Sequence, residues 1–171
     1  MFFIDRSKKI LMVNEQDSLP GRIDEMQFNE SHFVNNSSMK GPFPEGMSEI
    51  FLGMGCFWGA ERLFWNIEGV YVTSVGYAGG FTPNPLYEEV CSGLTGHTEV
   101  VHVVFDPKII SLQEILKIFW EGHDPTQGMR QGNDMGTQYR SAIYYSDETL
   151  LGQIKKSEVN YSEALKKEGY P

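Results

Sequence analysis

The apolar pattern of the chain changes its period within one short stretch, GMGCFWGAERLF at residues 53–64. Before the cysteine of this stretch, Ile50, Leu52 and Met54 alternate as the residues of a half-buried strand do. After it, apolar residues recur at the spacing of a helix: Phe57, Ala60, Phe64 and Ile67. Cys56 is therefore predicted to lie at a strand-to-helix junction.

The predicted position of Cys56 also indicates a chemistry. Unpaired backbone N–H groups and the helix dipole at the first turn of a helix favour negative charge, so they favour a thiolate over a thiol. A thiolate is a nucleophile. The alternative is that Cys56 is a small buried hydrophobic residue, as most free cysteines are.

Composition and charge limit the class of protein. The 171 residues suit one domain, and 40% hydrophobic with 13% aromatic residues is typical of a globular chain. The formal net charge of −9 argues against nucleic acid or an anionic membrane surface as a partner. No apolar run approaches the roughly 18 residues of a membrane span, and Asp5 interrupts the apolar stretch that a signal peptide needs. We therefore expect a soluble, cytoplasmic monomer.

The two cysteines, Cys56 and Cys91, form no C-x-x-C motif and no metal-ligand spacing with the four histidines. We therefore expect neither a zinc site nor a thioredoxin-type dithiol. What remains is one or two reactive or buried thiols.

The composition of the chain divides it into an N-terminal extension and a domain. Residues 1–47 are predicted to be irregular and to wrap the core, because asparagine, serine, glycine and proline dominate the stretch NESHFVNNSSMKGPFPEGM. Residues 48–171 are expected to form the catalytic domain. Within it, segment 81–96 has two prolines and several polar turn signals, which favour a long functional loop.

The remaining patterns predict a β-α-β-β-α-β core followed by a C-terminal helix. Two helices on one face of a mixed four-stranded sheet would make a two-layer α+β sandwich, related in topology to ferredoxin-like folds. Val70, Val72 and Ser74 are expected to share one face of the second strand. The expected strands occupy 49–54, 69–80, 97–106 and 138–146. The first expected helix follows Cys56, and the second follows a capping box of Ser111 and Glu114. The third is capped by Asp147 and runs to about Lys167.

One carboxyl group is predicted to point into an apolar environment. Glu99 shares a strand face with three apolar residues, Val101, Val103 and Phe105. Burial should raise the pKa of Glu99, and a carboxyl group that stays neutral can donate a proton where oxygen must leave as water. The alternative is that Glu99 lies at the frayed start of the strand and faces solvent.

Three further polar residues lie in or beside the glycine-rich loops. Tyr87 and Tyr139 carry phenols that can donate a hydrogen bond to a polar oxygen. Asp134 lies in the stretch GNDMG. Packing for the tyrosines and turn formation for the aspartate are the alternatives.

Three long segments of the sequence resemble one family. GCFWGAER, GYAGGFTPNPLYEEVCSGLTGHTEVV and HDPTQGMRQGNDMGTQYRSAIYY look like the signature segments of peptide methionine sulfoxide reductases of the A type, which reduce the S epimer of methionine sulfoxide. The resemblance extends over residues 44–145 in consistent order and spacing. The segment from about Leu19 also looks like an extension that some members carry.

The resemblance implies a role for each candidate residue. It makes Cys56 the nucleophile and Glu99 the proton donor. It further implies an apolar wall for the substrate's methyl group at Phe57 and Trp58, phenols that bind the sulfoxide oxygen at Tyr87 and Tyr139, and a surrounding polar network that includes Asp134.

The implied reaction needs no metal or organic cofactor. Cys56 would become a sulfenic acid, which thioredoxin or another thiol would reduce, and the substrate would be methionine sulfoxide, free or in proteins. Relatives often continue into a tail with resolving cysteines, whereas this chain stops at KKEGYP. We therefore expect one of two cases. Either the chain is a fragment whose C-terminal tail is missing, or Cys56 is recycled by the thiol of another molecule. Cys91 is not the usual resolver, and we interpret it as a small loop or core residue.

Two other classes of protein fit parts of the sequence. A cysteine hydrolase would use Cys56 with His97 or His123 as its base. A non-enzymatic module would bind methionine-containing peptides on its aromatic residues. Neither would consume a reductant.

Overall fold

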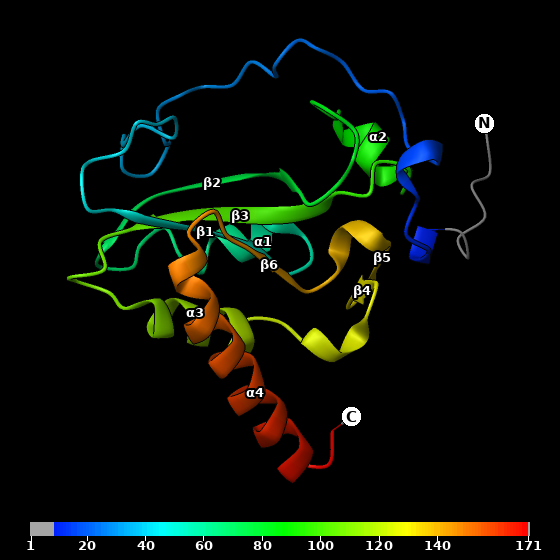
Figure 1. The fold of residues 1–171 in the computed structure, drawn as a ribbon. Helices are drawn as coiled ribbons and strands as arrows, with labels where there is room; N and C mark the ends of the chain where they lie inside the picture. Colours follow the sequence, from blue (N-terminus) through cyan, green and yellow to red (C-terminus); the bar gives the residue numbers. More distant parts are fainter. Residues whose placement is uncertain (1–8, 171) are drawn as a thin grey trace.

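The computed structural model describes residues 9–170, which contain a four-stranded sheet with the long helices packed on one side (Figure 1). The order across the sheet is β2-β3-β1-β6, and all three neighbouring pairs are antiparallel. The strands are β1 (Ser48–Gly53), β2 (Val70–Ala78), β3 (Thr98–Phe105) and β6 (Ala142–Tyr144). The predicted α+β class and the relation to ferredoxin-like topology are confirmed.

The prediction of a mixed sheet is wrong. The connection through the first helix does make β1 and β2 parallel to each other, as a β-α-β unit requires. However, β3 lies between them and runs in the opposite direction to both. The two parallel strands therefore never become neighbours, and every ladder is antiparallel.

A bulge in β2 also changes which residues face the core. The pairing with β3 shifts its register between Val70 and Val72, because Val70 pairs with Phe105 and Val72 with Val104. One extra residue reverses the alternation of faces. The prediction that Val70, Val72 and Ser74 face one way is therefore wrong, since the odd-numbered residues after the bulge share the face of Val70.

The helices are α1 (Phe57–Glu61), α2 (Tyr87–Cys91), α3 (Leu112–Glu121) and α4 (Leu151–Lys167). α3 begins at the predicted capping box, in which the Ser111 hydroxyl accepts from the Glu114 N–H at 3.3 Å and the Glu114 carboxylate accepts from the Ser111 N–H at 2.9 Å. Asp147 caps a 3-10 turn that leads into α4, which ends at the predicted residue.

Three elements differ from the predicted ones. α1 has only five residues, and the chain continues in tight turns that still bury Phe64. α2 forms inside the predicted loop 81–96, where Glu89 accepts from the Leu86 N–H and so completes a cap despite the nearby prolines. The last strand is shorter than predicted, because residues 137–139 turn into a 3-10 helix before it begins.

The remaining elements are short. Two-residue strands, β4 (Arg130–Gln131) and β5 (Asp134–Met135), form a small hairpin. The 3-10 helices are Glu15–Asp17, Pro125–Gln127, Thr137–Tyr139 and Glu148–Leu150. Within residues 9–47 the chain has the first of these helices and one isolated bridge, and it runs across the sheet from the region of α2 to β1 (Figure 1).

One hydrophobic core joins the sheet to the helices. It is formed from the inward faces of β1 and β3, from residues of α1, α3 and α4, and from Phe64 in the turns after α1; its members include Leu52, Phe105, Ile115 and Ile154. No helix among residues 9–170 has the length and apolar character needed to cross a membrane.

The capping box of α3 gives a first testable prediction. Ser111→Ala removes the hydroxyl that accepts from the Glu114 N–H, so we expect the free energy of unfolding to fall by about 1 kcal/mol. Urea unfolding measures the change. Gln113→Ala, at an exposed position of the same helix, is the control and should change stability little. An equal effect of the two substitutions would contradict the assigned cap.

Candidate active site

Cys56 is an exposed residue at the junction between the first strand and the first helix. β1 ends at Gly53, two buried residues follow, and Cys56 is the residue just before α1. Gly55 has a φ of +88°, and a Cβ atom on it would lie 2.6 Å from the Gln131 side chain. Glycine is needed at position 55, because only a residue without a Cβ atom adopts this φ readily and leaves room for Gln131 in the loop that follows α3. The predicted strand-to-helix position of the thiol is confirmed.

The side chain of Glu99 is buried at the start of β3, with 2% of the residue exposed. Its carboxylate accepts a hydrogen bond from the N–H of Phe57, the residue after Cys56, at 3.2 Å. Burial raises the pKa of Glu99 to about 7, against the opposing effect of this hydrogen bond and with a further increase from the charge of Asp134. The expected apolar environment is therefore present, and the solvent-facing alternative is wrong.

Tyr77 is a residue of this region that the sequence analysis missed. It lies directly across from Glu99 in the pairing of β2 with β3, and its ring centroid is 5.7 Å from that of Phe57. Burial, followed by the charge of Glu99, raises the pKa of Tyr77 to about 12. Its phenol is therefore a neutral hydrogen-bond donor. The bulge in β2, which alternation alone does not reveal, brings it to this face.

Tyr87, Tyr139 and Asp134 come from three separate elements and lie close enough to Glu99 for the charges to affect one another's pKa values. Tyr139 is half-buried at the end of a 3-10 helix, and its pKa is raised first by burial and then by the charge of Glu99. Tyr87 is the first residue of α2 and about half exposed. Asp134 is exposed in β5, and its charge raises the pKa of both Glu99 and Tyr139. The structure thus brings these predicted residues together.

Cys91 lies close to Tyr87. The Cys91 thiol is the largest cause of the raised pKa of Tyr87, and Glu99 and Cys56 add smaller effects. Cys91 is half-buried at the end of α2. It also lines a cavity of about 260 Å³, together with Asp134 and Tyr139.

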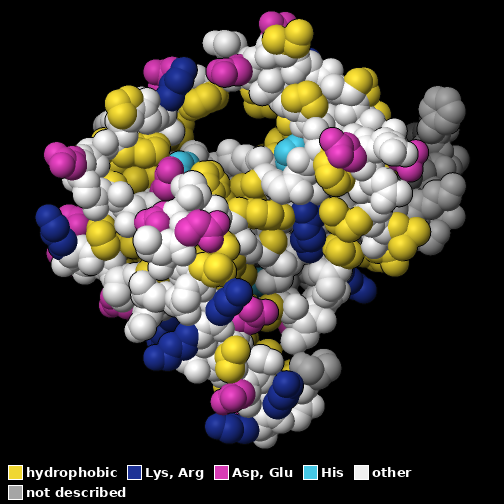
Figure 2. Space-filling model, viewed as in Figure 1, with side chains coloured by type: hydrophobic (Ala, Val, Ile, Leu, Met, Phe, Trp, Pro, Cys, Tyr) yellow, Lys and Arg dark blue, Asp and Glu magenta, His cyan; other side chains and the backbone are white. Residues whose placement is uncertain are grey.

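The two aromatic residues after Cys56 lie in different environments. Phe57 is buried and belongs to the hydrophobic core, whereas 72% of Trp58 is exposed. Their ring centroids are 6.4 Å apart. Trp58 is therefore the aromatic side chain that is open to a ligand from solvent. Figure 2 shows further hydrophobic side chains at the surface, over the N-terminal extension and around α2.

Neither candidate histidine is positioned as a base for Cys56. His97 accepts from the Gly80 N–H at 3.1 Å through Nδ1 and contacts the Thr82 carbonyl at 2.8 Å through Nε2. His123 contacts the Phe119 carbonyl at 2.7 Å and the Ser141 hydroxyl at 2.8 Å. Both rings are therefore held by other groups. Among residues 9–170, no cluster of three or more acidic, histidine or cysteine residues could hold a metal ion.

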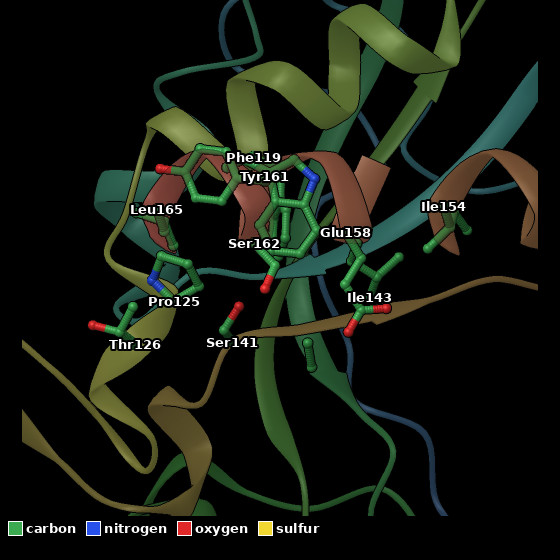
Figure 3. A pocket seen from close by; sticks show the side chains of 12 residues that line it. Phe119, Pro125, Thr126, Ser141, Ile143, Ile154, Glu158, Tyr161, Ser162 and Leu165 are labelled. Atoms are coloured by element: carbon green, nitrogen blue, oxygen red, sulfur yellow. The ribbon is translucent and has the colours of Figure 1, made fainter. Parts of the chain in front are cut away.

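A second cavity, of about 600 Å³, lies between α3, α4 and β6 (Figure 3). Its lining includes Phe119, Tyr161, Ile143 and Leu165, with Ser141 at one side. None of the predicted site residues lines it. The predicted site residues therefore lie outside this cavity, in the open region around Cys56.

An accessible thiol next to a buried carboxylic acid, on an α+β fold, fits a thiol-dependent enzyme. Residues 48–170 match the family described as peptide methionine sulfoxide reductase. The peptide methionine sulfoxide reductase MsrA of Brucella anthropi is 60% identical over 166 residues, which cover 96% of this chain and 76% of the relative. MsrA of Brucella ovis is 56% identical over 168 residues, which cover 98% of this chain and 77% of the relative.

Solved structures agree with these relatives. Methionine sulfoxide reductase A of Corynebacterium diphtheriae has a TM-score of 0.86 and 44% identity, covering 93% of this chain and 76% of that protein. Mxr1 of Saccharomyces cerevisiae in reduced form has a TM-score of 0.67 and 34% identity, and the match covers 71% of this chain and 72% of Mxr1. The chain belongs to the peptide methionine sulfoxide reductases and is an oxidoreductase, which rules out the hydrolase and the non-enzymatic module.

The buried acid gives a prediction about stability. The folded chain holds the Glu99 proton with a pKa of about 7, against an ordinary value of 4.5. The contribution of this proton to stability is complete below pH 4.5 and is lost as the pH rises through about 7. Between pH 4 and pH 8 we expect the free energy of unfolding of the parent to fall by roughly 3 kcal/mol more than that of Glu99→Gln, which has no carboxyl group to titrate at this position.

Urea unfolding at a series of pH values measures this difference. Glu163→Gln, which changes an exposed carboxylate of α4, is the matched control. If the curves of the parent and Glu99→Gln run parallel from pH 4 to pH 8, Glu99 does not retain its proton in the folded chain.

Proposed function

We propose that Cys56 and Glu99 together reduce the S epimer of methionine sulfoxide, free or in polypeptides. The observation that carries this proposal is the pair itself, an exposed thiol and a buried acid joined through the backbone of Phe57. Sulfoxide reduction needs two groups, a nucleophile for the electrophilic sulfur and an acid for the poor leaving oxygen. The residues of the pair are of the two required types.

The net reaction moves one oxygen from the oxidised substrate to the enzyme. The sulfur of Cys56 attacks the sulfoxide sulfur and forms an S–S bond, while the thiol proton and a proton from Glu99 go to the sulfoxide oxygen, which leaves as water when the S–O bond breaks. A water molecule then attacks the Cys56 sulfur and returns a proton to the Glu99 carboxylate, the S–S bond breaks, methionine leaves, and Cys56 becomes a sulfenic acid. Substrate sulfur is reduced by two electrons and the cysteine sulfur is oxidised by two, so the step needs no metal or organic cofactor.

The surrounding side chains would bind the substrate. Tyr87 and Tyr139 are proposed to donate hydrogen bonds to the sulfoxide oxygen, since their raised pKa values keep the phenols protonated. Asp134 would belong to the polar network around Glu99. The substrate's methyl group would contact the exposed ring of Trp58, with Phe57 fixing its position from the core.

Regeneration is proposed to use a thiol from another molecule, such as thioredoxin. One thiol condenses with the sulfenic acid to a disulfide and releases water, and a second thiol then frees Cys56. The exposure of Cys56 supports direct access by another molecule, whereas Cys91 is half-buried at the end of α2. Two free cysteines and a need for thiol reductant favour a reducing compartment, so we propose the cytoplasm. Residues 48–171 are proposed as the catalytic domain and 1–47 as its extension.

The first test replaces the nucleophile. Cys56→Ser should abolish reduction, because a serine hydroxyl is a far weaker nucleophile at neutral pH. The reduced parent, mixed with excess peptide S-sulfoxide and no reductant, should yield one methionine per chain and gain one oxygen atom by mass spectrometry. Retained turnover in Cys56→Ser would overturn the proposal.

The same experiment tests the source of the resolving thiol. Thiol titration after the single turnover should find Cys91 still free, and Cys91→Ser should give the same yield of methionine. A sulfenic acid reagent such as dimedone should label Cys56 of the parent. Loss of both thiols without labelling would instead identify an internal disulfide and make Cys91 the resolver.

The second test replaces the acid. Glu99→Gln keeps the size of the side chain and can still accept from the Phe57 N–H, but it cannot supply the proton. We expect the single-turnover rate of methionine formation to fall by about 10²–10⁴-fold. Glu163→Gln is the control and should react at the parent's rate. An unchanged rate in Glu99→Gln would remove this residue from the mechanism.

A further inference from the structure

We propose that Arg22, in the N-terminal extension, is a positioning residue that holds Tyr87 at the substrate site. This inference rests on the role proposed above for Tyr87. Residues 19–23, which we call the strap, lie against residues 82–94, the loop that includes α2. Arg22 acts from the strap on the first turn of α2, where Tyr87 is the first helical residue.

Hydrogen bonds attach the strap to both ends of this loop. The Leu19 N–H donates to the Leu94 carbonyl at 3.0 Å, and the Thr82 hydroxyl donates to the Leu19 carbonyl at 2.9 Å. The Arg22 N–H donates to the Pro83 carbonyl at 3.1 Å. In return, the Asn84 side-chain amide donates to the Arg22 carbonyl at 3.0 Å. The loop is therefore fixed at its beginning and at its end.

The two segments approach so closely that one strap residue must be glycine. Gly21 has a φ of +62°, and a Cβ atom on it would lie 2.2 Å from the carbonyl oxygen of Pro83. No real side chain tolerates that separation from a backbone atom. The contact is therefore a fitted one, not a loose association of two surface segments.

Arg22 connects the strap to the cap of α2. Its guanidinium donates to the Glu89 carboxylate at 2.8 Å and also to the Asn84 carbonyl. The other oxygen of Glu89 accepts from the Leu86 N–H at 2.8 Å, which caps the helix. The Arg22 hydrogen bond is the largest cause of the lowered pKa of Glu89, so the carboxylate stays ionised. Arg22, Glu89 and Leu86 thus form one chain of contacts that ends beside Tyr87.

α2 needs this support because it has little of its own. A helix of five residues is too short to be stable alone, and Val90 is its one buried residue. Tyr87 is about half exposed, so packing restricts its side chain only in part. The direction of its phenol therefore depends on the first turn of α2, and the strap fixes that turn.

Steady-state kinetics with N-acetyl methionine S-sulfoxide amide and dithiothreitol tests the proposal. Arg22→Ala should lower kcat/KM about fivefold, the loss expected when a part-exposed, charge-assisted contact is removed. Arg22→Lys should restore part of the loss, because it keeps the ion pair with Glu89 but not the second contact. Lys40→Ala, which breaks the exposed pair with Glu30 in the same extension, should leave kcat/KM unchanged.

The Tyr87→Phe background separates positioning from general stabilisation. If Arg22 acts through the phenol, Arg22→Ala should change kcat/KM by less than about twofold once that phenol is gone. An equal loss in both backgrounds, or no loss in the parent, would overturn the proposal.

Hydrogen exchange gives a readout that needs no enzyme activity. The amides of residues 86–91 should exchange about tenfold faster in Arg22→Ala than in the parent, and Lys40→Ala should match the parent. Unchanged exchange in Arg22→Ala overturns the positioning role. A parent that fails to reduce sulfoxide while Arg22→Ala still loosens α2 would instead refute the proposed function and leave the strap contact established.

Discussion

The pairing of β3 with a strand on each side is the constraint on which the rest of the structure depends. β3 is buried along almost its whole length, and its backbone is bonded to β1 on one side and to β2 on the other. A strand so held cannot slip by one residue without turning its core face toward the opposite layer. Glu99 is thereby fixed near the start of β3, Tyr77 is fixed opposite it, and the N–H of Phe57 is brought to its carboxylate.

The burial of Glu99 opposes stability at neutral pH, and this distinguishes it from the structural carboxylates of the chain. Glu114 and Glu89 each accept two hydrogen bonds at the start of a helix, and both have a lowered pKa. Glu99 has one backbone donor and an apolar surrounding, so its pKa moves in the opposite direction. A carboxyl group kept in such a place without an ion-pair partner is typical of a functional site.

Local patterns predicted much of the fold, and contacts distant in sequence explain the errors. The capping box at Ser111 and the apolar face of Glu99 depend on residues within a few positions, so the sequence analysis found both. The bulge in β2 depends on how β2 pairs with β3, and it hid the orientation of Tyr77. α2 is capped by Glu89, whose carboxylate is bonded to Arg22, more than sixty residues earlier in the chain. Alternation and turn propensity contain no information about such partners.

The single hydrogen bond from Phe57 to Glu99 has a consequence for the cycle of the enzyme. A carboxylate accepts more strongly than a carboxylic acid, so this N–H favours the state of Glu99 that exists after its proton has left. The hydrogen bond therefore favours release of the Glu99 proton and opposes its return to the carboxylate. With a pKa of about 7, Glu99 keeps its proton in only part of the molecules at neutral pH. In the role proposed for Glu99, the fraction of enzyme able to donate this proton therefore falls as the pH rises.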